Sequence, residues 1–444
     1  TGDVVGRVLG GGAGLELVDA ICPDGLATMA MVFPTAHRAM LRVVLPVGDV
    51  GDTAPGYPSV LPNATDVASG WEVHRRGPRF EIPELHLAAS VERARAQLQL
   101  AHDGASVRRD GHRSPDLEPG ATEVILGAFD VLDRPTEVGT VVARWTDRLA
   151  TPTPEVDALF LATVSRHWLL HRVDALLDWM LPEVAAAVER LDRADRKGRL
   201  TEPAARHLAT GALAAAGRML RGAGQGDAAE AIAALAARLS VGAKPANAST
   251  ADRLVHVSER LASGDATAMA ELDAMVGDAS TTGAWAGPGP GGRQIGQDLA
   301  AAAAVVLAAR AVLFAERSDG VAILPVHPDG WYGAGIEVHD APTEWGRLSY
   351  AIRWHGIRPA LLWEFAPHRG VGPVHVTAPG LDPSWSTTEE RGDALLGEVV
   401  PPRGLRSIAV VSEHPDIDPV MRRPGSDPSL KPTPPAVPEG GSFS

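Results

Sequence analysis

The hydrophobic pattern changes its period twice along the chain, and this constrains the fold more than any other feature. From Pro83 to about Arg317, apolar residues recur every three or four positions, the spacing of one face of an α-helix. After Gly320 they alternate at every second residue, as in a half-buried β-strand. Before Pro83, short apolar runs are separated by Gly, Pro and Asp, as in strands joined by turns. We therefore expect an α+β chain with a helical core between two β-rich segments.

These changes of pattern predict domain boundaries. We expect a β-sandwich-like N-terminal segment at residues 1–82 with a surface loop at 49–68, and an all-α domain at 83–317. A C-terminal β module at 318–412 and a flexible Pro-rich tail at 413–444 follow. After the helix that begins at Pro83, helical patterns recur at residues 121–132, 137–149, 155–170, 173–191, 202–220, 227–239, 250–262, 267–276 and 299–317.

The C-terminal module contains a clear hairpin pattern. In residues 346–355, Leu348, Tyr350, Ile352 and Trp354 share one face, and polar residues occupy most of the other. Residues 356–359 predict a turn and 360–365 a second strand. Further strands are expected at 374–378 and 407–412.

Composition limits the partners and the compartment. The chain has 444 residues, a net charge of −14 and no basic cluster, which argues against nucleic acid or an anionic membrane as partner. The single cysteine, Cys22, excludes an internal disulfide. No run reaches the roughly 18–20 apolar residues of a membrane span. No signal peptide is recognisable, so we expect a cytoplasmic protein, although the chain begins at Thr1 and a preceding segment stays open.

One part of the C-terminal module resembles a known family. It contains Val-Ala-Ile-Leu-Pro at 321–325, Trp331, Gly-Ile-Glu-Val at 335–338, Ala-Pro-Thr at 341–343, Gly-Arg-Leu-Ser-Tyr at 346–350 and Arg-Trp-His-Gly at 353–356. This is similar to the β module that follows the helical toroid in bacterial glycogen-debranching-like, six-hairpin glycosidases. The resemblance implies an α/α toroid-like core of helical hairpins. It also implies an active site in loops between helices, where two carboxylates flank a glycosidic bond.

The segment 281–298 corresponds to part of that active site. Such enzymes carry Trp-Pro-Glu and then a glycine-rich loop ending in Gly-Asp-Gly-His before the last long helix. This chain keeps Trp285, the glycines and Asp298, but it lacks the Glu and the His. Asp298 is therefore a candidate catalytic acid. The alternative is a helix-starting Asp that accepts hydrogen bonds from free backbone N–H groups.

A polar segment between two predicted helices supplies the other candidates. Asp110 or Asp116 would pair with Asp298 as catalytic carboxylates, and His112 with Trp168 and Trp285 would bind the substrate. The alternative is a solvated loop in which Asp116 favours a helix N-terminus electrostatically.

Two histidines on one predicted helix raise the question of a metal. His167 and His171 are four residues apart, a spacing that can bind zinc, but the His-Glu-x-x-His motif needs a Glu where this chain has Trp168. We therefore expect no metal site. The glycine-rich segments lack the βα context of a nucleotide site, and we expect no cofactor.

Two functions follow from the resemblance. The first is a glycoside-hydrolase-like protein of carbohydrate metabolism that acts on an α-glucan or another oligosaccharide. The second is a pseudoenzyme of the same fold that binds glycan or serves as a scaffold, which the missing Glu and His favour. A third hypothesis is that the chain is an unrelated helical protein that mediates interactions with other proteins. The sequence leaves the linkage and the oligomeric state undetermined.

Overall fold

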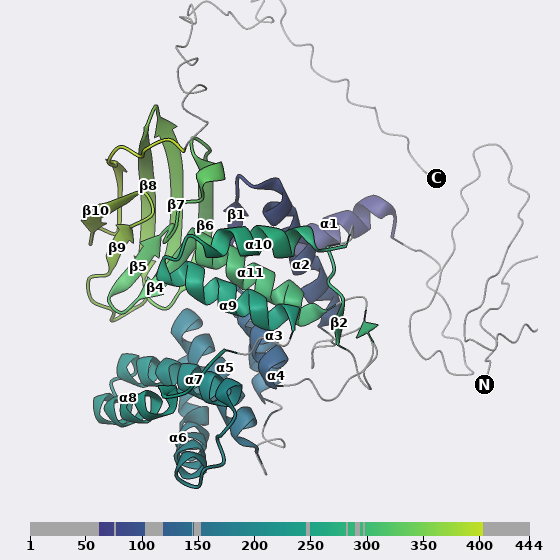
Figure 1. The fold of residues 1–444 in the computed structure, drawn as a ribbon, viewed down its shortest axis with the longest axis vertical. Helices are drawn as coiled ribbons and strands as arrows, with labels where there is room; N and C mark the ends of the chain where they lie inside the picture. Colours follow the sequence, from purple (N-terminus) through teal and green to yellow (C-terminus); the bar gives the residue numbers. More distant parts are fainter. Residues whose placement is uncertain are drawn as a thin grey trace, which may run out of the picture. The chain divides into compact units, whose positions relative to one another are not determined.

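The computed structural model describes residues 62–74, 77–102, 119–143, 145, 152–245, 249–280, 283–288, 294–295 and 298–402. The chain divides into two units between Asp66 and Val67, within the first helix, and apart from the start of that helix the fold below is that of the second unit. Within it, helices and sheets combine in a mixed α+β fold, as the sequence predicts (Figure 1).

The predicted helical patterns from Leu85 onward each contain a helix. The helices are α1 (Ala64–His74), α2 (Leu85–Ala101), α3 (Pro119–Val131), α4 (Pro135–Ala143), α5 (Pro154–His171), α6 (Asp174–Arg196), α7 (Pro203–Gly222), α8 (Gly226–Ser240), α9 (Thr250–Ser263), α10 (Ala268–Gly277) and α11 (Leu299–Leu313). Two short strands, β2 (Gly287–Pro288) and β3 (Gln294–Ile295), pair with each other between α10 and α11.

Helix α1 begins inside the surface loop predicted at residues 49–68, so that prediction is wrong from Ala64 onward. The Asn63 side-chain oxygen accepts the Asp66 N–H at 2.9 Å, and the Asp66 carboxylate accepts the Asn63 N–H at 3.3 Å. This reciprocal capping arrangement satisfies backbone donors that a helix start would otherwise leave free.

Helix α11 lies at the centre of the helical part and contacts α2, α3 and α9. Its alanines from Ala300 to Ala304 are all buried, because small side chains let neighbouring helices approach on several sides. The helix was predicted to reach Arg317 but ends at Leu313. From Phe314 the chain is extended, because Phe314–Arg317 pairs as a strand with the segment that follows it.

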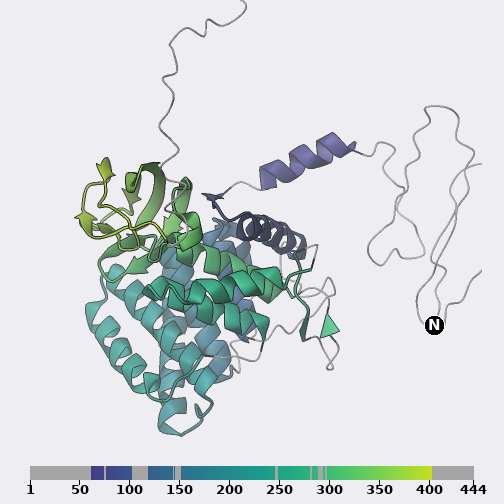
Figure 2. The same cartoon turned by 45° about the horizontal axis from the view of Figure 1, so that its top comes forward.

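Helix α5 organises the other helices of this part. It packs against α3, α4, α6 and α7, and α7 packs against α8. Figures 1 and 2 show α5 to α8 together at one end of the helical part, apart from α9, α10 and α11. Arg190 of α6 binds the buried carboxylate of Asp157 of α5 through contacts of 2.8 to 3.1 Å, which fixes these two helices against each other.

The C-terminal part forms two sheets. The five-stranded sheet has the order β1-β6-β7-β8-β11 and the four-stranded sheet the order β10-β9-β5-β4. The strands are β1 (Arg79–Glu81), β4 (Phe314–Arg317), β5 (Gly320–Ile323), β6 (Ile336–Thr343), β7 (Gly346–His355), β8 (Arg358–Pro367), β9 (His375–Ala378), β10 (Asp382–Thr387) and β11 (Arg391–Leu395). Strand β6 contacts α3 and α5, which joins the first sheet to the helices.

The predicted hairpin is confirmed by the pairing of β7 with β8, in which Tyr350 lies opposite Trp363. Leu348, Tyr350 and Ile352 are buried on one face, as their alternation predicts. Strand β9 confirms the strand predicted at 374–378.

Strand β1 belongs to the sequence predicted as the N-terminal segment, yet it pairs with β6 and forms an edge of the C-terminal sheet. Residues 1–61, the strand predicted at 407–412 and the tail at 413–444 lie outside the described residues. The domain boundaries therefore stay predictions.

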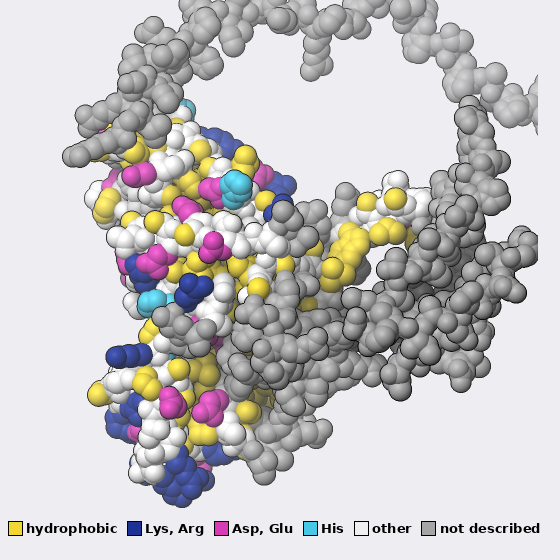
Figure 3. All heavy atoms as spheres, turned by 45° about the vertical axis from the view of Figure 1, so that its right-hand side comes forward, with side chains coloured by type: hydrophobic (Ala, Val, Ile, Leu, Met, Phe, Trp, Pro, Cys, Tyr) yellow, Lys and Arg dark blue, Asp and Glu magenta, His cyan; other side chains and the backbone are white. Residues whose placement is uncertain are grey.

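The described surface carries both signs of charge. Figure 3 shows acidic and basic side chains interspersed over the face in view. None of the helices in the described ranges has the length and apolar character needed to cross a membrane.

Candidate functional site

Trp285 and Asp298, two residues implied by the resemblance, lie side by side. The Asp298 N–H donates to the Trp285 carbonyl at 2.8 Å. One oxygen of the Asp298 carboxylate accepts the N–H groups of Ala300 and Ala301 at 3.0 and 3.3 Å, and the residue is 1% exposed. The indole N–H of Trp285 donates to the Met275 carbonyl at 2.9 Å within the core. The carboxylate thus caps α11, and the indole is part of the packing.

This capping role predicts a modest effect on stability. We expect Asp298→Ala to lower the free energy of unfolding by about 1–2 kcal/mol, because the first turn of α11 loses its acceptor. Asp298→Asn, which offers the same acceptor, should cost clearly less. Urea unfolding of the two variants measures the difference. Equal losses in both would show that the carboxylate charge, and not the cap, stabilises this position.

The other predicted residues lie elsewhere. Trp168 is buried near the C-terminal end of α5, where its indole N–H donates to Asp174 at 2.9 Å. The Arg172 guanidinium lies over its ring at 4.0 Å from the ring centre, so this face is covered. Asp110, His112 and Asp116 lie outside the described residues.

A pocket of about 470 Å³ opens where four helices meet. We call it the Trp71 pocket. It is formed by residues from α1, the end of α2, the end of α3 and the start of α4, namely Val67, Gly70, Trp71, Gln99, His102, Phe129, Arg134 and Glu137.

The turn from α3 to α4 positions two charged residues in this pocket. Asp133 adopts a left-handed backbone with φ of 59°, a conformation that Asp tolerates better than most residues. The Arg134 N–H donates to the Phe129 carbonyl at 2.9 Å, which closes the turn. Pro135 then starts α4, because a proline fits the first position of a helix. Arg134 and Glu137 thereby line the pocket together with the buried Phe129.

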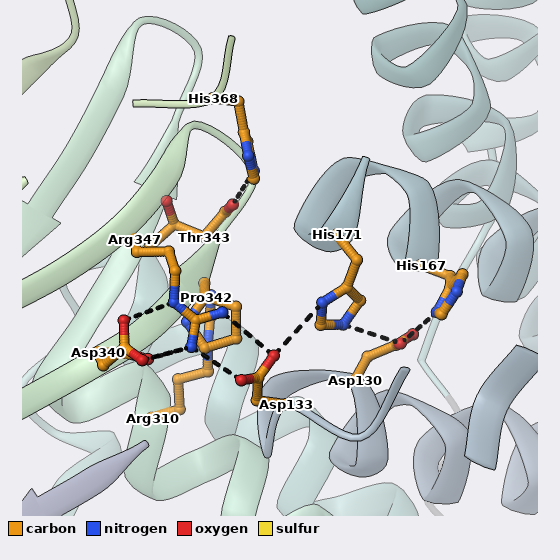
Figure 4. A network of polar contacts seen from close by, with 10 residues as sticks. All are labelled: Asp130, Asp133, His167, His171, Arg310, Asp340, Pro342, Thr343, Arg347 and His368. Carbon is orange, nitrogen blue, oxygen red and sulfur yellow. Dashed lines mark hydrogen bonds and ion pairs between the residues drawn. The ribbon is translucent and has the colours of Figure 1, made fainter. Parts of the chain in front are cut away.

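A buried polar network begins on the same helix, one residue after Phe129 (Figure 4). Asp130 of α3 lies between His167 and His171 of α5. Its Oδ1 is 2.7 Å from Nδ1 of His167 and 3.4 Å from Nε2 of His171. The four-residue spacing of the histidines places both on one face of α5, toward α3.

The network continues to the sheet through Asp133 (Figure 4). Its Oδ1 is 3.6 Å from Nδ1 of His171, and its two oxygens accept hydrogen bonds from Arg347 of β7 at 3.1 and 2.9 Å. Arg347 also donates to Asp340 in the middle of β6. Burial opposes the charge of Arg347, but the hydrogen bonds to Asp133 and Asp340 outweigh it and raise its pKa. The network therefore ties α3, α5 and the five-stranded sheet together.

Sequence reasoning missed both the Trp71 pocket and Asp130. Asp130 had a visible signal, because it is the charged residue in the otherwise apolar run from Val124 to Val131. The signal for the pocket was weaker, since its residues come from four separate helices and Trp71 lies only three positions after the stretch predicted as loop at 49–68.

A scan against models of known protein families finds no match for the chain, and a search of curated proteins finds none either. A function is therefore assigned from the geometry of the chain's own residues.

Proposed function

We propose that the chain is a glycan-binding protein related to the glycoside hydrolases, with a core of helical hairpins arranged like an α/α toroid, and that the Trp71 pocket holds a sugar unit. The observation that carries this proposal is the lining of the pocket. A half-buried tryptophan lies with an amide, a guanidinium and a carboxylate around a space of about 470 Å³. This size is within the range of about 300–1,000 Å³ common for small-molecule sites.

The chemistry of a sugar matches this lining. A pyranose ring has an apolar face of C–H groups, which stacks on an aromatic ring, and a rim of hydroxyls that both donate and accept hydrogen bonds. Trp71 supplies the aromatic ring. Gln99, Arg134 and Glu137 supply donors and acceptors around it. Arg134 and Glu137 also carry opposite charges, which favours a neutral ligand over an ionic one.

The positions of the carboxylates favour binding over hydrolysis. A glycosidase needs two carboxylates on either side of the bond, about 5 to 10 Å apart. Among the described residues that line the Trp71 pocket, Glu137 is the one carboxylate. Asp298, the predicted acid, is buried at the start of α11 and engaged in its cap. These positions support the non-hydrolytic alternative.

Trp71→Ala should weaken oligosaccharide binding by up to about tenfold, since an aromatic stacking contact contributes about 0.5–1.5 kcal/mol and 1.4 kcal/mol corresponds to a factor of ten. Calorimetric titration with maltooligosaccharides, and with β-linked oligosaccharides as a second class, measures the change. Trp71→Phe keeps an aromatic face and should retain most of the affinity.

Trp179 provides the matched control, because it is an exposed tryptophan on α6 that does not line the pocket. Trp179→Ala should bind sugar like the wild type. Equal losses in both variants, or no binding by the wild type to any sugar tested, would contradict the proposal. Assays of the same mixtures for new reducing ends test hydrolysis, and turnover that falls in Glu137→Gln would replace the binding proposal with an enzymatic one.

A further inference from the structure

We propose that Asp130, His167 and His171 form a binding site for a divalent transition-metal ion, with zinc the best match. The three side chains come from two helices and are 0, 2 and 6% exposed, respectively. One ligand atom from each lies within 4.8 Å of the others. This site is separate from the Trp71 pocket and does not depend on the sugar proposal.

The spacing of one pair of ligand atoms, from His171 and Asp130, already fits the ion, whereas Nδ1 of His167 is hydrogen-bonded to Oδ1 of Asp130 at 2.7 Å and would have to move apart from it to share a metal. Zinc bonds of about 2.0–2.1 Å in a tetrahedron place the ligand atoms about 3.4 Å apart. The separation between Nε2 of His171 and Oδ1 of Asp130 is 3.4 Å. Imidazole and carboxylate are ligands that zinc accepts readily, and three protein ligands leave the fourth position to a water molecule.

Two buried atoms of this cluster lack the partners that such atoms normally have. Oδ2 of Asp130 and Nε2 of His171 form no hydrogen bond within the described part of the chain. Buried polar atoms are nearly always satisfied, because an unsatisfied one costs its full desolvation free energy. A cation between these two atoms would satisfy both.

The surroundings of His171 match a metal-bound histidine. Its Nδ1 faces the Asp133 carboxylate at 3.6 Å, and Arg347 holds that carboxylate from the other side (Figure 4). A carboxylate at the second ring nitrogen fixes the orientation of the ring and the tautomer that leaves Nε2 free to bind a metal. Asp133 is therefore a positioning residue for His171.

The C-terminal ends of α3 and α5 add an electrostatic field that favours a bound cation. Asp130 is in the last turn of α3 and His171 is the last residue of α5, so two helix C-termini meet at the cluster. The partial negative charge of a helix C-terminus stabilises a cation nearby. Because Trp168 replaces the Glu of the His-Glu-x-x-His motif, the site lacks the general base of that motif, and we assign it the role of linking α3 to α5.

A second acidic and histidine cluster provides the comparison. Glu81, Glu337 and His339 also lie close together, but Glu81 is exposed and the other two are only partly buried. Arg353 binds Glu337, and Arg79 lies 3.1 Å from Nε2 of His339. Positively charged side chains of the protein therefore already occupy these potential metal ligands. This cluster is not a candidate, and its histidine serves as a control.

The test uses the full chain, stripped of metal with a chelator, and titrates it with zinc by calorimetry. We expect one zinc ion per wild-type chain and a melting temperature that rises with added zinc. His171→Gln and His167→Gln should bind at least a hundredfold more weakly, and Asp133→Asn about 10- to 100-fold more weakly. His339→Gln should bind like the wild type.

Cobalt provides a second measurement, because its visible absorption distinguishes a tetrahedral site from a solvated ion. The wild type should give an intense tetrahedral spectrum that His171→Gln lacks. Asp133→Asn changes only the charge of a partly exposed side chain, so it tests the site even where a core histidine variant does not fold. Absence of stoichiometric zinc binding by folded wild type, or equal binding by wild type and Asp133→Asn, would overturn the proposal.

Discussion

Replacing Arg190 with methionine should lower the free energy of unfolding by about 3–5 kcal/mol at neutral pH, the usual cost of leaving a buried ionic partner unpaired. The Asp157 side chain is 2% exposed, whereas that of Arg190 is 26% exposed. Removal of the guanidinium leaves the buried carboxylate without its cation. Urea unfolding at pH 7 measures the loss.

The loss of stability in Arg190→Met should also depend on pH, and in a defined direction. In the wild type, burial raises the pKa of Asp157, and the hydrogen bond and charge of Arg190 oppose that rise. Without Arg190 the folded-state pKa rises further, while the unfolded value stays near about 3.9. An acid whose pKa is raised by folding destabilises the fold above its folded pKa, and this penalty disappears as pH falls toward the unfolded pKa. The loss in Arg190→Met should therefore shrink between pH 7 and pH 5.

Arg193→Met is the matched control, because Arg193 is an exposed residue of the same helix. It should change stability by less than about 0.5 kcal/mol. A loss in Arg190→Met below 1 kcal/mol, or one that does not change with pH, would contradict the ionic account.

Gly320→Ala should destabilise the fold by about 2–3 kcal/mol, toward the upper end of the usual range for overpacking. A β-carbon at Gly320 would lie 1.9 Å from the carbonyl oxygen of His375 and 2.7 Å from its backbone nitrogen. Since these atoms belong to the neighbouring strand β9, the strands would have to separate. Gly372→Ala is the control, because its β-carbon would meet no atom within 4 Å. Thermal unfolding of both variants tests this, and equal melting temperatures would show that the strands tolerate the added carbon.

The helices could be predicted because their signal is local. Apolar spacing located α2 to α10, and the alternation in residues 346–355 located β7. The end of α11 was mispredicted for a physical reason. Phe314–Arg317 becomes a strand by pairing with β5, and the apolar character of Phe314 and Ala315 suits a buried helix as well as a buried strand.

The sites could be predicted only in part. The sequence left two roles open for Asp298, a catalytic acid and a helix cap. The structure shows the helix cap. The His167 and His171 pair was visible from its spacing, but Asp130, 37 residues before His167, was not connected to it. Contacts between distant segments depend on the packing of whole helices, which a local pattern does not contain.

The most direct test of sugar binding in the Trp71 pocket is a crystal structure of the full chain with a bound maltooligosaccharide. We expect one sugar ring stacked on Trp71, with its hydroxyls hydrogen-bonded to Arg134 and Glu137. A sugar bound instead beside Trp285 and Asp298, or an empty Trp71 pocket at a saturating sugar concentration, would contradict it.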